Sequence, residues 1–132
     1  MKAMATTNER AQVITVGGDE YELLLTTAAT KEIGAKFGGL QKLGEELMKP
    51  EKFEQGIDVV SDLICLLANQ SIRRHNVKHP ENPKPELTAE TLELLTEPWE
   101  LTEFNSAIMA AITKGTNRNV RSEVDSKNAP GG

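Results

Sequence analysis

Aromatic residues and cysteine are scarce in this chain of 132 residues, and each scarcity removes a class of protein. Aromatic side chains make up 4% of the sequence, too few for the stacking platforms that bind single-stranded nucleic acid. A lone cysteine, Cys65, cannot form an internal disulfide, which favours a reducing, cytoplasmic setting. No apolar run approaches the roughly 18 residues of a membrane span. A formal net charge of -5 opposes generic binding to nucleic acid or anionic membranes, so we expect neither as a partner.

The length predicts a single domain, since domains average roughly 100 to 200 residues. A chain of this size buries about two thirds of its unfolded surface, which suffices for a core without a metal or a disulfide. We therefore expect folding without a cofactor. Residues 1–12 are polar and predict a flexible leader. Residues 13–115 predict the domain, and residues 116–132, which are poor in large aliphatic side chains, predict a flexible, disordered tail.

Hydrophobic periodicity predicts a mainly α fold that begins with a β-hairpin. β-Prone residues flank Gly17-Gly18 as in a two-residue hairpin, whose strands must pack on helices to be stable. The apolar arc of residues 53–74 is wide, as is typical of a central, mostly buried helix, and we expect the hairpin to pack on it. Gly115 predicts the end of the last helix. The bundle of about five expected helices covers approximately residues 27–37, 40–47, 53–74, 88–95 and 99–112.

Short patterns that resemble catalytic or metal-binding motifs lack the companions that such chemistry needs. Gly17-Gly18-Asp19-Glu20 spells the signature of diguanylate cyclases, but those domains need a large sheet before the motif; a plain hairpin turn is the alternative. His75 and His79 have the spacing of zinc ligands on one helical turn, yet no cysteine pair completes the site. Cys65 lies in an apolar stretch, which predicts a raised thiol pKa and no nucleophile. We expect no enzyme, cofactor or metal; a metal-dependent or nucleotide enzyme is the competing hypothesis.

Charge is segregated into two stretches that form the candidate partner-binding surface. The basic strip, at the end of the expected central helix, consists of Arg73, Arg74 and Lys78. The acidic face consists of Glu90, Glu93, Glu97, Glu100 and Glu103. An acidic run is usually a solvated helix face, and the alternative is a docking surface for a basic partner. Trp99, at the start of the last expected helix, is either a core anchor or an interface hot spot.

Four segments, taken in order, resemble one family. They are Ile14-Thr15-Val16-Gly17-Gly18-Asp19-Glu20-Tyr21, the helix end at residues 33–38, Leu66-Leu67-Ala68-Asn69-Gln70, and His75-Asn76 followed by His79-Pro80-Glu81-Asn82-Pro83. This order is similar to that of the small tail assembly chaperones of long-tailed phages and prophages of Gram-positive bacteria. The resemblance covers most of residues 13–112 and the ending Lys127-Asn128-Ala129.

The resemblance implies a mostly helical, non-enzymatic protein that acts in the host cytoplasm during tail morphogenesis and is absent from the mature virion. Chaperones of this family bind the tape-measure protein, keep its long helical chain soluble and help recruit the tail-tube protein. An apolar groove bordered by charge suits such a task, in the mode of a helix bound in a groove. The charged surfaces also allow a homo-oligomer. A bacterial helical adaptor or regulatory protein outside any phage is the alternative function.

Overall fold

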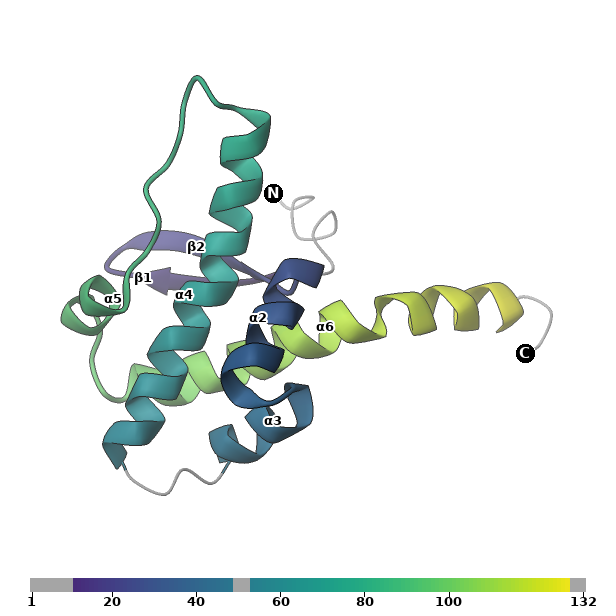
Figure 1. The fold of residues 1–132 in the computed structure, drawn as a ribbon, viewed down its shortest axis with the longest axis horizontal. Helices are drawn as coiled ribbons and strands as arrows, with labels where there is room; N and C mark the ends of the chain where they lie inside the picture. The colour runs from purple at the N-terminus through teal and green to yellow at the C-terminus, as the bar shows by residue number, and fades with distance from the viewer. Residues whose placement is uncertain (1–10, 49–52, 129–132) are drawn as a thin grey trace.

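The computed structural model describes residues 11–48 and 53–128 and is mainly helical, with one antiparallel hairpin at its start (Figure 1). The elements are β1 (Ala11–Val16), β2 (Asp19–Leu24), α2 (Thr27–Phe37), α3 (Leu40–Met48), α4 (Phe53–Lys78), α5 (Ala89–Leu95) and α6 (Glu100–Asn128). The predicted mainly α fold with an N-terminal hairpin is confirmed. Residues 1–10 of the expected leader and 129–132 of the expected tail lie outside the described residues.

The hairpin turns at two glycines in the left-handed region of φ. Gly17 has a φ of 59° and Gly18 a φ of 92°, conformations that cost glycine little because it has no Cβ. Positive φ at both central residues gives the turn whose twist matches that of the strands it joins. Val16 pairs with Asp19 directly beyond the turn. The Gly-Gly-Asp-Glu pattern is therefore explained by a tight hairpin turn.

The start of β1 and the end of α4 differ from the sequence prediction. β1 begins at Ala11 rather than at residue 13, because Ala11 and Gln12 both pair with β2, so they belong to the domain and not to a leader. α4 extends to Lys78, one turn beyond the predicted end near residue 74, and the N–H of His79 still donates to the C=O of His75 at 2.8 Å. Pro80 then prevents a further helical turn, since it disfavours helical backbone at the preceding residue.

Helix α4 is the centre of the fold. β2 and α6 pack against it, and α6 also packs against β1, so the hairpin rests on both helices (Figure 1). This arrangement confirms that the hairpin packs on the central helix. The core draws side chains from every element, and among those that are completely inaccessible are Val16, Leu23, Ile33, Leu43, Leu63, Ile64, Leu67, Leu92 and Ile108.

The last helix continues through the glycine that was predicted to end it. Gly115 is not among the glycines with positive φ, and α6 runs on to Asn128. The prediction of a helix end at Gly115 is wrong because this glycine serves a close approach. A Cβ placed on Gly115 would lie 2.7 Å from the Cβ of Leu25, which directly follows the hairpin. Glycine inside a helix costs only about 1 kcal/mol relative to alanine, so the helix tolerates it.

We predict that Gly115→Ala destabilises the protein by about 1–3 kcal/mol, because the added methyl group forces Leu25 or the backbone to move. Gly34→Ala is the matched control in α2, where an added Cβ meets nothing within 4 Å. It should stabilise the protein by about 0.5–1 kcal/mol through helix propensity. Urea unfolding followed by circular dichroism measures both changes. An equal gain in stability for the two variants would contradict the close approach.

Candidate functional site

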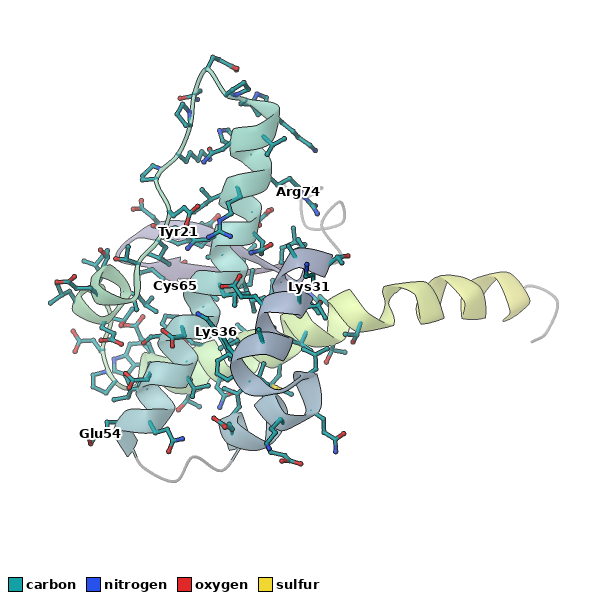
Figure 2. All side chains as sticks on the ribbon, viewed as in Figure 1. Tyr21, Lys31, Lys36, Glu54, Cys65 and Arg74 are labelled. Atoms are coloured by element: carbon teal, nitrogen blue, oxygen red, sulfur yellow. The ribbon has the colours of Figure 1, made fainter. Side chains whose placement is uncertain are left out.

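The basic strip lies on the last turns of α4, and part of it is engaged within the molecule. Arg74 and Lys78 are exposed, and Figure 2 places Arg74 on the half of α4 opposite to Glu54. Arg73 instead donates two hydrogen bonds to Glu86, at 2.8 Å from Nε and 3.1 Å from the terminal nitrogen. This hydrogen bonding raises the pKa of Arg73 and lowers that of Glu86. Arg74 and Lys78 are therefore the more accessible members of the strip.

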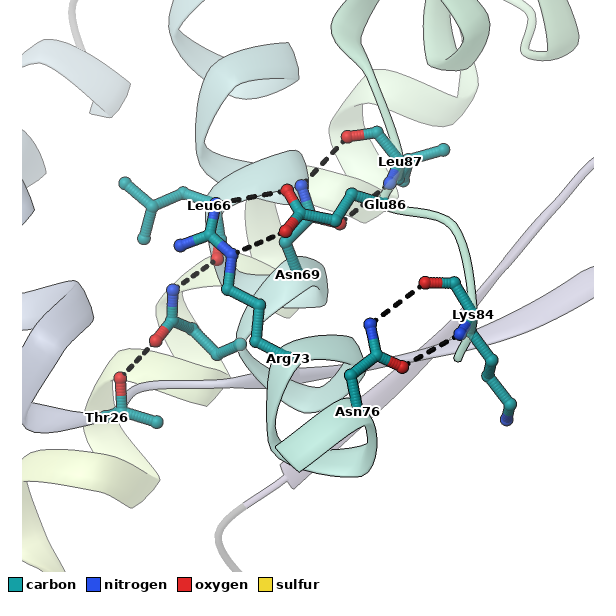
Figure 3. A network of polar contacts seen from close by, with 9 residues as sticks. Thr26, Leu66, Asn69, Arg73, Asn76, Lys84, Glu86 and Leu87 are labelled. Carbon is teal, nitrogen blue, oxygen red and sulfur yellow. Dashed lines mark hydrogen bonds and ion pairs between the residues drawn. The ribbon is translucent and has the colours of Figure 1, made fainter. Parts of the chain in front are cut away.

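The segment after α4 is held against that helix by two side-chain amides, and we call residues 79–88 the strap (Figure 3). Asn69 donates to the C=O of Leu87 at 2.9 Å and accepts from its N–H at 2.7 Å. Asn76 makes the same two bonds to Lys84, at 3.0 and 2.8 Å. Because Asn69, Arg73 and Asn76 follow helical spacing, all three face the strap. Each amide thus replaces the backbone partner that the proline-rich strap lacks.

We predict that Asn69→Ala destabilises the protein by about 2–4 kcal/mol, because it leaves the buried N–H and C=O of Leu87 without partners. Asn76→Ala is the matched control, since it removes the same pair of bonds where Lys84 is exposed. Water replaces that partner, so the expected cost is about 1 kcal/mol or less. Chemical unfolding of both variants tests the difference. Equal losses would show that burial does not set the cost.

The two histidines lie together where α4 meets the strap. Their ring centroids are 4.9 Å apart, and Nε2 of His75 donates to the C=O of Asn82 at 2.9 Å. Nδ1 of His79 lies 3.6 Å from a carboxylate oxygen of Glu81. Among the described residues, no group of three or more His, Cys, Asp or Glu side chains is arranged to hold a metal ion. Here the histidine pair contributes to the packing of the strap.

Cys65 is buried in α4, and its thiol is correspondingly hard to ionise. Burial, together with smaller contributions from the nearby carboxylates of Asp62 and Glu93, raises its pKa from 9.0 to about 11. This direction confirms the expectation from its apolar sequence neighbours. A nucleophilic cysteine needs the opposite shift, because the thiolate is the reactive form.

We predict that the native state loses stability as the pH rises from 9.0 to 11. The unfolded thiol ionises first, near 9.0, while the folded thiol keeps its proton until about 11. The contribution of Cys65 is therefore complete below pH 9.0 and falls across this interval. Urea midpoints measured at the two ends of the interval test this, with Cys65→Ala as the control for other groups that titrate there. An identical fall in the variant would remove Cys65 as the cause.

An open groove of about 980 Å³ runs between β1, the hairpin turn and α6, and we call it the edge groove. Three of its large apolar side chains are exposed: Trp99 is 66% exposed, Leu95 51% and Val13 48%. The core-anchor interpretation of Trp99 is therefore wrong. The edge groove is lined by residues 12–15, 17–18, 95, 99–100, 102–104, 106–107 and 110.

Trp99 lies in the short turn that leads into α6. The N–H of Glu97 donates to the carboxylate of Glu100 at 2.8 Å, and the N–H of Glu100 donates to the C=O of Glu97 at 2.9 Å. These two bonds close a tight turn directly before α6, in which the side chain of Glu100 caps the backbone N–H of Glu97. Pro98 and Trp99 occupy this turn, and Trp99 remains exposed.

The edge groove contains only some of the predicted partner-binding residues. It contains Trp99, Glu100 and Glu103, and these two glutamates are the only ionisable side chains among its described lining residues. The other predicted residues do not line it: Arg73, Arg74, Lys78, Glu90, Glu93 and Glu97. Sequence reasoning missed Val13 and Leu95, which meet only through the tertiary fold. The sequence Val-Ile-Thr-Val at residues 13–16 gives no local signal that Val13 is exposed, and only the structure shows exposed and buried residues alternating along β1.

Comparisons with models of protein families, with curated proteins and with solved structures find no match to this chain. In the part of the chain that the structure describes, no helix has the length and apolar character needed to cross a membrane. A functional argument therefore depends on the chain's own surfaces. The edge groove is the strongest of them, because it combines a concave shape, exposed apolar side chains and charge of one sign.

Proposed function

We propose that this protein is a tail assembly chaperone of a long-tailed phage or prophage, which binds the tape-measure protein and helps recruit the tail-tube protein in the host cytoplasm. The observation that carries the proposal is the edge groove, where Trp99, Leu95 and Val13 expose apolar surface beside two glutamates. The resemblance of the ordered sequence segments to this family of chaperones supports the choice of function and of partners.

A chaperone for a long apolar chain needs a surface that shields the partner from water. Trp99 and Leu95 supply such a surface, and each Å² of apolar area that a partner covers contributes about 25 cal/mol before the costs of association. Tryptophan is also enriched among the residues that dominate binding energy. Glu100 and Glu103 contribute orientation and association rate toward a basic partner more than affinity.

We predict that co-expression keeps the tape-measure protein of the same genome soluble and yields a complex that co-purifies. Trp99→Ala should weaken that complex by at least about tenfold, since loss of a hot-spot side chain costs about 2 kcal/mol or more. Leu95→Ala and Leu94→Ala form a matched pair on α5, because Leu95 lines the edge groove whereas the 79% exposed Leu94 does not. Only Leu95→Ala should reduce binding.

A tape-measure protein that stays insoluble, with no complex recovered, would contradict the chaperone proposal. A helical adaptor would then be the better interpretation, since the same groove would serve a different partner. Equal effects of Leu94→Ala and Leu95→Ala on a complex that does form would show that another surface carries the binding.

A further inference from the structure

The outer edge of β1 is open along the edge groove. Four consecutive residues of the strand, 12–15, line the groove. Because side chains alternate between the two faces of a strand, a groove on one face would be lined by every second residue. A run of consecutive residues instead indicates that the groove follows the strand's edge, where the backbone itself is accessible.

The register identifies the backbone groups on that edge. The two-residue turn makes Val16 and Asp19 a hydrogen-bonded pair, and such pairs alternate with non-bonded ones along an antiparallel hairpin. Thr15 and Val13 fall at the non-bonded positions, so their N–H and C=O groups point away from β2. Within the described residues the sheet has only these two strands.

The strand itself lacks two of the features that often protect an edge, a charged residue and a proline. Its sequence is AQVITV. Its β-branched residues favour strand pairing. Helix α6 also extends beneath this open edge, because Thr102, Ser106 and Ala110 line the groove together with β1. These short side chains leave space above α6 for one more strand.

We infer that the outer edge of β1 binds an extended segment of a partner protein as a third strand, and that this segment alternates apolar and basic side chains. Apolar side chains would contact Val13, Leu95 and Trp99, while basic ones would face Glu100 and Glu103. A second copy of this chain is a poorer occupant, because it brings the same glutamates to the contact. The inference rests on the proposed docking role of the groove and concerns the binding mode, whichever protein is the partner.

The first test uses a short synthetic peptide in which lysine alternates with valine, added to the full chain. Trp99 is the only tryptophan, so its fluorescence reports occupation of the edge groove directly. We expect saturable binding that weakens with salt and is at least about tenfold tighter than for a glutamate-valine peptide. Hydrogen exchange of the Val13 and Thr15 amides should slow at least about tenfold at saturation, since the added strand bonds to both groups.

The second test removes one hydrogen-bond donor from the edge. Val13→Pro deletes an N–H that points outward, a position where an edge strand accepts proline, and should abolish peptide binding. Val13→Thr keeps the N–H and a similar shape, and should retain binding within about threefold. Unchanged binding by Val13→Pro would overturn the inference. If Val13→Pro fails to fold, amide exchange in the unaltered chain decides the question.

Further outcomes separate the alternatives. A fluorescence change without slower exchange at Val13 and Thr15 would mean that the groove binds a partner in another mode, so the inference fails while the proposed docking role stands. No response to the peptide at millimolar concentration overturns strand addition. A concentration-dependent dimer that protects the same amides would assign the edge to a second copy. Binding that occurs only after removal of residues 1–8 would assign it to the chain's own N-terminal segment.

Discussion

The fold depends on the need of α4 to bury nearly its whole circumference. From residue 59 to residue 70 every side chain except that of Asp62 is buried. A helix that is buried on nearly all sides cannot be covered by one neighbour, so β2, α6, α5 and the helices before α4 surround this stretch. The hairpin needs the same contact, because two strands alone are marginally stable in water. Central helix and hairpin therefore stabilise each other, and the remaining helices complete the shell.

Elements with a strong local signal could be predicted from the sequence. The hairpin, the cap of α5 at Thr88 and the left-handed end of α2 at Gly38 each depend on residues close in the chain. Gly115 could not be read correctly in this way. A glycine that ends a helix and a glycine that admits a neighbour look alike in sequence, and only the position of Leu25 distinguishes them. The amide pairs of Asn69 and Asn76 likewise join residues that local patterns do not connect.

The candidate site likewise combines residues that are close in the chain with residues that only the tertiary fold brings together. Trp99, Glu100 and Glu103 lie within five consecutive residues, so their proximity follows from the local chain alone. Val13 and Leu95 join them only because α6 packs along β1 and α5 ends beside the hairpin turn. The charge segregation in the sequence predicts one binding surface that contains both the basic strip and the acidic face. In the structure Arg73 pairs with Glu86, and the basic strip lies outside the groove. The charged residues of the sequence thus indicated which positions are exposed, and tertiary packing determines which of these positions lie close together.

The two glycines of the hairpin turn differ in the substitutions that they can tolerate. A Cβ on Gly17 would lie 3.0 Å from Leu95, in addition to the strain of its positive φ, whereas a Cβ on Gly18 would meet nothing within 4 Å. Isolated turns of this kind ordinarily favour asparagine at the first position and glycine at the second. Contact with Leu95 reverses that preference. Relatives that keep this packing should retain glycine at the first position and can replace the second with asparagine or aspartate. Such relatives would lack the cyclase-like Gly-Gly-Asp-Glu motif and still form the hairpin.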